Sequence, residues 1–218
     1  MRWVGVDEAG RGSFLGPLVV GAFAIDSDGV DGLRAAGVRD SKILTPAART
    51  ACYDRLRTLG TMRSISLDPA TIDGAVARHR LNDLEATAFG RILGGLHPDE
   101  ARVDACDADP ARFGARVRRA GGLTVPVRAA HHADRDDPVV GAASIVAKVR
   151  RDRAIAALAA RLGRPVGSGY PSDPETVAFV REWLAVHRQP PRWLRRSWAT
   201  MGRVMPPPRA RTLDRFDP

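Results

Sequence analysis

The sequence predicts a mixed α/β fold, in which a sheet is flanked by helices and followed by a helical extension. Three observations lead to this prediction. Short apolar segments of strand length are spread over the first two thirds of the chain. Pairs of a capping residue and a proline mark the starts of helices between them. No convincing strand appears after about residue 139, so the last third is expected to be helical.

Five segments have the length and apolar content of strands. They are 2–8 (RWVGVDE), 17–26 (PLVVGAFAID), 62–67 (MRSISL), 101–106 (ARVDAC) and 123–128 (LTVPVR). Because the first two follow each other closely, the fold is expected to begin with a hairpin-like pair. The other three alternate with segments of helical period, which indicates a mixed sheet.

Four helix starts are indicated by a capping side chain followed by proline at the first helical position. These pairs are Thr45-Pro46, Asp68-Pro69, Asp109-Pro110 and Asp137-Pro138. The helix from Pro138 is expected to run to about Leu162 and to end at Gly163. Ser172 and Glu175 have the spacing of a capping box, which predicts a further helix through about His187.

The composition indicates a polyanionic partner. The chain has 218 residues, enough for one large domain or one domain with a helical extension. Its 34 Lys and Arg against 25 Asp and Glu give a formal charge of +9, and the basic residues are nearly all arginine. Positive charge favours phosphate backbones, but many basic proteins bind nucleic acid only incidentally.

The same sequence gives no sign of secretion or membrane insertion. Cys52 and Cys106 are the only cysteines, which suggests a reduced, intracellular protein without a disulfide framework. The opening MRWVGVDEAGRG lacks the apolar run of a signal peptide, and no segment reaches the ~20 apolar residues of a bilayer span. We therefore expect a soluble, cytoplasmic protein with no membrane partner.

The segment VDEAGRGSFLGP, residues 6–17, places two adjacent carboxylates before a glycine-rich turn. Strand neighbours point to opposite faces, so Asp7 and Glu8 reach one site only if the strand ends and twists there. Hard oxygen ligands clustered in this way suit Mg²⁺ or Mn²⁺ better than zinc. The simplest alternative is that both acids are solvated charges at the end of a strand.

A dinucleotide-binding loop is a second alternative for this turn, since Gly10, Gly12 and Gly16 resemble a glycine-rich fingerprint. The spacing is one residue too long, and an apolar strand follows where a phosphate loop needs a helix N-terminus. The preceding carboxylates would also repel a pyrophosphate. This interpretation therefore ranks low.

Two further acids occupy comparable positions. Asp104 lies at the end of the strand ARVDAC, and Asp134 lies in the loop HHADRDD before the long helix. Four carboxylates from separate elements can hold a pair of divalent ions that activate water for phosphodiester hydrolysis. The nearby competitors are Asp107, Asp109, Asp136 and Asp137, of which the second and fourth have helix capping as the simpler role.

His131 and His132 lie beside Asp134 and raise the question of a transition-metal site. No cysteine or further histidine completes such a ligand set in the sequence. Phosphate contact or simple exposure is the expected role of both histidines.

Five motifs, taken in order along the chain, resemble those of the ribonuclease HII family. They are DEAGRG at 7–12, DSK at 40–42, VDACD at 103–107, AASIVAKVRRD at 142–152 and GSGYPSD at 167–173. The resemblance extends to about Met201, and RRSWATM at 195–201 is similar to the archaeal branch of the family. It implies a ribonuclease H-like sheet with a C-terminal helical extension. It also implies that Asp7, Glu8, Asp104 and Asp134 are the catalytic acids and hold two Mg²⁺ or Mn²⁺ ions.

The resemblance also implies residues that read the substrate. Gly10, Arg11 and Gly12 match the turn that meets the ribonucleotide at an RNA–DNA junction through backbone groups and the arginine. Tyr170 matches the tyrosine that stacks on the neighbouring deoxyribose. The simpler alternatives are that Arg11 is an ordinary surface arginine and that Tyr170 packs within its glycine-rich turn.

Four more residues match positions that contact the substrate strand or its phosphates. Ser41 and Lys42 match a phosphate-contacting pair, and Ser144 and Lys148 lie in a family motif with a related role. Lys42 is alternatively a solvated loop charge. Ser144 is alternatively a small residue packed in a helix, and Lys148 has a possible ion-pair partner in Asp152 one turn further on.

The activity that the resemblance implies is endonucleolytic cleavage of the RNA strand of RNA–DNA hybrids, and cleavage 5′ to ribonucleotides embedded in duplex DNA. The expected organisation is a catalytic domain over 1–150, a helical region over 151–203 and a flexible basic tail over 204–218. The tail keeps Leu213 and Phe216 on one helical face, which is similar to a motif that docks on the DNA sliding clamp. The family suggests a monomer.

Other functional classes stay open on the sequence alone. A basic nucleic-acid-binding protein without catalysis accounts for the charge, but gives no reason for four acids in these settings. An integrase or resolvase on a related sheet is disfavoured by DEAGRG and GSGYPSD. A nucleotide-dependent oxidoreductase is a distant alternative. Metal-dependent cleavage separates an enzyme from a binding protein.

Overall fold

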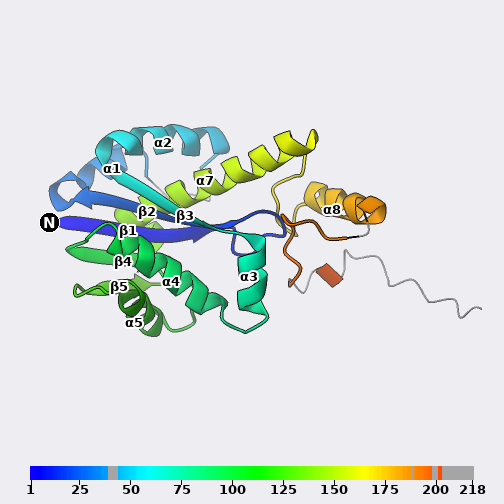
Figure 1. Ribbon diagram of the computed structural model, residues 1–218. Helices are drawn as coiled ribbons and strands as arrows, with labels where there is room; N and C mark the ends of the chain where they lie inside the picture. The colour runs from blue at the N-terminus through cyan, green and yellow to red at the C-terminus, as the bar shows by residue number, and fades with distance from the viewer. Residues whose placement is uncertain (39–43, 188, 198–200, 203–218) are drawn as a thin grey trace, which may run out of the picture.

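A five-stranded sheet forms the centre of the computed structural model, which describes residues 1–38, 44–187, 189–197 and 201–202 (Figure 1). The strands are β1 (Arg2–Ala9), β2 (Leu18–Asp26), β3 (Thr61–Leu67), β4 (Glu100–Asp104) and β5 (Val127–Ala130). Their order is β3-β2-β1-β4-β5. The pairs β1–β2 and β2–β3 are antiparallel, while β1–β4 and β4–β5 are parallel. The predicted mixed sheet is therefore confirmed.

Helices cover both faces of this sheet (Figure 1). They are α1 (Asp31–Ala35), α2 (Pro46–Leu59), α3 (Pro69–Val76), α4 (Leu81–Gly94), α5 (Pro110–Ala120), α6 (Ala133–Asp136), α7 (Pro138–Leu162) and α8 (Pro174–His187), with a short 3₁₀ turn at Ser27–Gly29. One face is covered by α7 and α2, and the other by α4 and α5. No helix of the described part is both long and apolar enough to cross a membrane.

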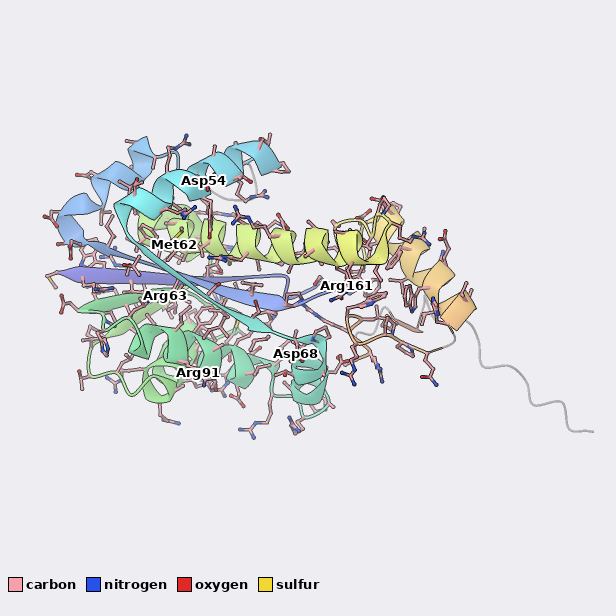
Figure 2. All side chains as sticks on the ribbon, turned by 45° about the horizontal axis from the view of Figure 1, so that its top comes forward. Asp54, Met62, Arg63, Asp68, Arg91 and Arg161 are labelled. Carbon is pink, nitrogen blue, oxygen red and sulfur yellow. The ribbon has the colours of Figure 1, made fainter. Side chains whose placement is uncertain are left out.

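Burial differs between central and edge strands, as the sequence pattern indicates. Every residue of β2 from Leu18 to Ile25 is buried, because helices cover both of its faces. The edge strand β3 exposes part of its length to solvent. Its residues Met62 and Arg63 are labelled in Figure 2; the first packs against the cluster beneath α7, and the second is exposed.

Each face of the sheet has its own apolar cluster. On the α4–α5 face, Phe89 and Phe113 meet edge to face with ring centroids 5.4 Å apart. On the α7 face, Phe23 and Tyr53 are buried together with the apolar side of the helix. Buried apolar side chains on both faces are the dominant stabilising contribution of such a domain.

Helix α7 lies against the backbone of the central strands. A Cβ atom placed on Gly21 of β2 would lie 2.5 Å from the amide nitrogen of Ala147 and 2.6 Å from the carbonyl oxygen of Ala143. Real Cβ atoms do not approach backbone atoms so closely. Glycine at this position therefore sets the distance between α7 and the sheet.

The predicted helix caps are confirmed. The side chains of Thr45, Asp68, Asp109 and Asp137 accept hydrogen bonds from backbone N–H groups of the first helical turn at 2.8–3.2 Å. Each is followed by proline at the helix start. Gly163 ends α7 with a positive φ of 65°. The simpler capping role of Asp109 and Asp137 is thus the observed one.

The strand predicted over 123–128 is misplaced. β5 spans Val127–Ala130, since Val127 pairs with Ala101 and residues 121–122 form a turn. Leu123 packs on the core from the loop, and Pro126 has no N–H to give to a strand ladder. The strand predicted over 101–106 is also shifted, because β4 ends at Asp104.

The predicted capping box at Ser172 is wrong. α8 begins at Pro174, and the Asp173 carboxylate accepts a hydrogen bond from the Glu175 N–H at 3.0 Å. Asp173-Pro174 is therefore a further pair of the same kind as the four identified in the sequence. The rest of the prediction is correct, since α8 ends at His187.

The C-terminal part of the described chain adds a third apolar cluster beyond the end of the sheet. Ile155 and Leu158 from the last turns of α7 pack with Phe179 of α8 and with Phe14 and Leu15 of the loop after β1. This confirms the predicted helical extension. It also brings the extension against the loop in which the glycine-rich turn lies.

Candidate active site

All four predicted acids line one cavity at the carboxyl ends of β1 and β4, with a volume of about 250 Å³. The lining residues are Asp7, Glu8, Ala9, Gly10, Arg11, Gly12, Asp104, Asp134, Ser144, Lys148 and Tyr170. Every predicted site residue in the described part is therefore in this cavity. Ser41 and Lys42 lie outside the described residues.

Asp7 is the most buried acid of β1. It pairs across the sheet with Gly21, so its side chain points to the α7 face, where Ser144 donates a hydrogen bond to it. Burial raises the pKa of Asp7 well above its ordinary value, and repulsion by Glu8 and Asp104 raises it further. Asp7 is therefore a carboxylate held in a crowded, negatively charged environment.

Glu8 reaches the same cavity although it follows Asp7 directly. The strand does not end between them, because Glu8 and Ala9 still pair with Val20 and Val19 of β2. The cavity lies at the end of the strand and so receives side chains from both faces. The Glu8 N–H donates to Asp7 Oδ1 at 2.6 Å, which ties the two acids together locally.

Asp104 and Asp134 enter from the neighbouring strand and helix. β1 and β4 are parallel, and Val6 pairs with Val103, so Asp7 and Asp104 follow at the same level. Asp104 Oδ1 accepts a hydrogen bond from the Ala133 N–H at 2.7 Å, which holds the start of α6 against β4. Asp134 is the second residue of α6 and is buried. Strand pairing and one cap-like bond thus bring four distant acids together.

The chemistry of these donors fits a hard divalent cation. The acids offer carboxylate oxygens only, and the repulsion that raises the pKa of Asp7 is what a cation would relieve. Among the described residues, no group of three or more His, Cys, Asp or Glu side chains is arranged so that it could hold a metal ion by itself. Mg²⁺ is usually held by one or two carboxylates together with water and substrate phosphate, so it does not require such a group.

The two histidines next to Asp134 do not take part in the site. Neither lines the cavity. The Nδ1 atom of His131 lies 3.2 Å from the carbonyl oxygen of Ala105, and His132 has a positive φ of 58° just before α6. Both histidines are exposed, which is one of the two roles expected for them.

The glycine-rich turn is fixed by its backbone and by Arg11. Gly10 has a φ of +88°, and a Cβ there would lie 2.9 Å from the carbonyl oxygen of Pro17. Arg11 donates to Glu85 at 2.5 Å and to Asn82 at 2.7 Å, both on α4. It is therefore not an ordinary surface arginine, since its guanidinium is anchored on the helix beside the cavity.

Glu85 is a participant that the sequence did not reveal. Its side chain is fully buried, and burial raises the pKa of its carboxyl while Arg11 lowers it. A glutamate within an apolar helical pattern gives no signal of such a role, because its partner lies 74 positions away. The pair fixes Arg11 at the rim of the cavity.

Tyr170 follows a turn whose shape depends on glycine. Gly167 and Gly169 have φ values of 69° and 85°, and the Gly169 N–H donates to the Thr176 hydroxyl at 2.8 Å. The ring of Tyr170 is partly buried, with the Arg151 guanidinium 4.4 Å from its centroid. Tyr170 therefore lines the cavity while its ring also contacts the guanidinium of Arg151.

Lys148 enters the cavity from α7 and is paired as the sequence allowed. Its ammonium lies 3.0 Å from Asp152, which also contacts Arg49 at 3.2 Å and Arg151 at 3.3 Å. Burial lowers the pKa of Lys148, and the two arginines lower it further. Three cations around one carboxylate leave positive charge next to the four acids.

Asp173 organises the turn that carries Tyr170, which gives a testable prediction. It accepts hydrogen bonds from Ser168 N at 2.5 Å, Glu175 N at 3.0 Å and the Thr176 hydroxyl at 3.1 Å. These bonds hold its pKa at about 2, below the ordinary 3.8. Asp173→Ala is expected to lower the free energy of unfolding by about 1–2 kcal/mol at neutral pH.

The pH dependence of this effect follows from the lowered pKa. The ionised Asp173 contributes its full stabilisation above about pH 4, and this is lost as the pH falls towards 2. Urea unfolding at several pH values from 6 to 3 should therefore show the two proteins converging in acid. Asp54→Ala, an exposed site on α2, is the control. A difference that stays constant with pH would contradict the assignment.

A larger hollow of about 790 Å³ lies beside α4 and α5 but contains none of the four acids. Its two arginines are paired, Arg112 with Asp107 at 2.5 Å and Arg116 with Asp83 at 3.0 Å. The smaller cavity is the candidate site, because the four carboxylates lie there.

A mixed five-stranded sheet with carboxylates at the ends of two neighbouring parallel strands defines the class of ribonuclease H-like nucleases. The family model for ribonuclease HII matches residues 4–201, so the chain belongs to the ribonuclease HII family. It is therefore a ribonuclease H. The alternatives of a non-catalytic binding protein and of an oxidoreductase are set aside on this finding.

Individual relatives agree with this assignment. Ribonuclease HII of Cenarchaeum symbiosum (strain A) is 47% identical over 195 residues, which cover 89% of this chain and 93% of the relative. The crystal structure of ribonuclease H2 from Pyrococcus horikoshii OT3 is similar with a TM-score of 0.86 and 39% identity, covering 94% of this chain and 97% of that one. The resemblance to the archaeal branch is thus confirmed.

Two further structures extend the comparison. A chain in the PCNA:RNase HII complex from Archaeoglobus fulgidus has a TM-score of 0.83 and 36% identity, over 91% of this chain and 95% of that one. Bst-RNase HIII in complex with Mn²⁺ has a TM-score of 0.74 at 19% identity, over 85% of this chain and 62% of that one. The second likeness concerns the fold alone.

Proposed function

We propose that this ribonuclease H cuts the RNA strand of RNA–DNA hybrids and cuts 5′ to ribonucleotides embedded in duplex DNA, leaving 3′-hydroxyl and 5′-phosphate ends. The observation that carries the proposal is the meeting of Asp7, Glu8, Asp104 and Asp134 in one cavity beside the Gly10–Gly12 turn and Tyr170. Carboxylates suit phosphodiester hydrolysis, while an aromatic ring beside a glycine turn suits recognition of one sugar and its neighbour.

The four acids would hold two Mg²⁺ or Mn²⁺ ions. When bound, such ions lower the pKa of the attacking water and neutralise charge on the leaving oxygen. The Mn²⁺ in the Bst-RNase HIII structure supports the kind of ion by analogy of fold. The task of the protein itself is to hold carboxylates and scissile phosphate in one arrangement, and no covalent intermediate on a side chain is needed.

The remaining residues have roles in binding and orientation. Backbone groups of Gly10 and Gly12, with the anchored Arg11, would contact the 2′-hydroxyl and the adjacent phosphate. Ser144 holds Asp7 by a hydrogen bond and would act through it, while Lys148 supplies positive charge for the substrate strand. Ser41 and Lys42 are proposed to contact phosphate, on the resemblance alone.

Tyr170 is expected to set the preference for the junction. Tyr170→Ala should lower kcat/KM on DNA with one ribonucleotide about 10- to 100-fold, because a stacked base or sugar contributes ~1–3 kcal/mol. Duplex affinity should change much less, since phosphate contacts dominate it. Tyr170→Phe keeps the ring and is the matched control. Equal losses on the junction and on a continuous hybrid would contradict this role.

The test of the proposal uses end-labelled duplex DNA that carries one ribonucleotide. The protein is incubated with Mg²⁺, Mn²⁺ or chelator, and the cut is mapped. A metal-dependent nick 5′ to the ribonucleotide is expected. If only a continuous RNA–DNA hybrid is cut, the ribonuclease H assignment stands and the junction specificity is wrong.

We further propose that the C-terminal tail docks on a DNA sliding clamp through Leu213 and Phe216. Both residues lie outside the described part of the chain. The PCNA complex of the Archaeoglobus fulgidus relative supports the idea by analogy. Pull-down of the clamp by the full chain, compared with a chain lacking residues 206–218, tests it; equal capture would contradict it.

The cellular role that fits this activity is removal of ribonucleotides from DNA during repair or replication, in the cytoplasm and as a monomer. The proposed organisation is a catalytic domain over 1–150, a helical region over 151–203 and a basic tail over 204–218. α7 runs without a break through the first of these limits. The helical region therefore begins within a helix that also packs on the sheet.

A further inference from the structure

The C-terminal segment after α8 returns to the loop that follows β1 (Figure 1). Leu194 forms an antiparallel bridge with Leu15. The Gly16 N–H donates to the Trp193 carbonyl at 2.9 Å, and the Arg195 N–H donates to the Phe14 carbonyl at 2.9 Å. Residues 193–195 thus lie alongside residues 14–16, which follow the Gly10–Gly12 turn, as a short two-stranded contact.

The side chain of Arg195 reaches beneath the loop after β1 and bonds to it at two places, Arg11 and Gly16. It is completely buried. Its Nε and Nη2 atoms donate to the Gly16 carbonyl at 3.2 and 3.1 Å, and its Nη1 atom donates to the Arg11 carbonyl at 2.8 Å. One rigid guanidinium therefore fixes the separation of residues 11 and 16.

The bond to the Arg11 carbonyl also orients the next peptide group. In a trans peptide the C=O and N–H groups point in opposite directions. Because the Arg11 carbonyl points to Arg195, the Gly12 N–H points away from it. Gly12 lines the cavity of the four acids, so Arg195 sets the direction of a backbone donor at the rim of that cavity.

Tyr170 is linked to the same loop. Phe14 N and Leu15 N both donate to the Gly169 carbonyl, at 2.7 and 3.2 Å. Arg151, only 1% exposed, fills the space between the two turns: a Cβ on Gly169 would lie 2.6 Å from its Nη2 atom, and one on Gly10 3.3 Å from its Cγ atom. A displacement of the loop after β1 therefore also moves the turn that carries Tyr170.

Keeping a charged guanidinium at this depth has a cost. Burial lowers the pKa of Arg195 to about 10, and the neighbouring Arg151 contributes to the lowering. Burying a charge is unfavourable unless hydrogen bonds compensate for it. The bonds described above are made to carbonyls of the turn, so the compensation and the positioning of the turn are the same contacts.

We propose that Arg195 is a positioning residue for catalysis. It holds the Gly10–Gly12 turn and the turn that carries Tyr170 in the arrangement that recognises a ribonucleotide. The inference rests on the proposed function for the role of that turn. The inference goes beyond the proposed function because it gives the C-terminal segment a part in the specificity of the reaction. Arg195 does not line the cavity itself and so acts through the turn.

The test compares Arg195→Lys and Arg195→Gln with the wild-type chain. Lysine keeps the charge but loses the planar fork, and glutamine loses both. Arg196→Lys is the matched control, since its side chain is exposed and its Nη2 atom donates to the Pro190 carbonyl, away from the Gly10–Gly12 turn. Steady-state cleavage is measured on DNA with one ribonucleotide and on a continuous hybrid, and amide hydrogen exchange is measured without substrate.

We expect Arg195→Lys to lower kcat/KM on the embedded ribonucleotide about tenfold or more, because misplacement near 1 Å has effects of this size. The loss on the continuous hybrid should be smaller. Exchange should accelerate for residues 10–16 and 167–170 but not for α4 and α5. A purely structural role would lower both activities alike and accelerate exchange throughout the chain.

Each outcome has a definite meaning. If the wild-type chain cuts the hybrid but makes no nick at the embedded ribonucleotide, the proposed function is wrong. The exchange data then still decide whether Arg195 holds the turn. If the wild-type chain makes the nick and Arg195→Lys keeps both its ratio of activities and its exchange pattern, Arg195 is not a positioning residue. Should Arg195→Gln not fold, the lysine variant alone gives the decision.

Discussion

Asp7→Asn is expected to lower the turnover of the ribonuclease by about 10³-fold or more, since metal ions stabilise such transition states by several kcal/mol. The substitution removes the negative charge at the centre of the four acids and keeps the size of the side chain. Asp7 is 5% exposed, and its pKa is raised by burial and by its acidic neighbours. Removing that repulsion should leave the melting temperature unchanged or slightly higher.

This combination of results separates a catalytic acid from a structural one. Turnover is measured with Mg²⁺ on end-labelled substrate, and unfolding is followed by calorimetry or circular dichroism. Asp26→Asn, an exposed residue at the end of β2, is the control and should keep wild-type activity. If Asp7→Asn retains more than about a tenth of wild-type turnover, the assignment of Asp7 to metal binding is wrong, because such a loss corresponds to only ~1.4 kcal/mol.

Local signals in the sequence were enough to predict most of the fold. A capping side chain before proline acts within four residues, so Thr45, Asp68, Asp109 and Asp137 could be assigned without knowledge of the tertiary structure. The error at β5 has the opposite origin. Leu123 packs on a distant core, and the alternation around it reflects that contact and not strand pairing. Propensity cannot distinguish these two causes.

The candidate site was predictable for a different reason. Its acids stand in short motifs whose order along the chain resembles a known family, although no spacing argument brings Asp134 to Asp7. The structure adds the residues that hold these motifs in place: Glu85, which anchors Arg11, and Arg151 and Arg195, which lie beneath the turns. Glu85 pairs with a distant arginine, Arg195 donates to backbone carbonyls, and Arg151 pairs with the adjacent Asp152. Arg151 and Arg195 stand in motifs of the family, but the sequence alone does not show that they lie beneath these turns.

Gly21→Ala is expected to have the largest effect on stability. The added Cβ would meet the backbone of α7 at 2.5 Å and 2.6 Å, and a backbone cannot rotate away as a side chain can. Overpacking of this kind costs about 1–3 kcal/mol, and we expect the upper end of the range. For a chain of this length the melting temperature should fall by about 6–12 °C.

The same substitution should also lower activity, because Gly21 pairs with Asp7 across the sheet. A shift of α7 away from β2 moves Ser144 from Asp7 and Lys148 from the cavity, so kcat should fall in the population that stays folded. Gly32→Ala in α1 is the control, since its Cβ meets nothing within 4 Å and alanine favours a helix. Turnover measured well below the melting temperature tests whether the position of α7 affects catalysis. A destabilised Gly21→Ala protein with wild-type kcat would show that the packing of α7 on β2 stabilises the fold but does not position the active site.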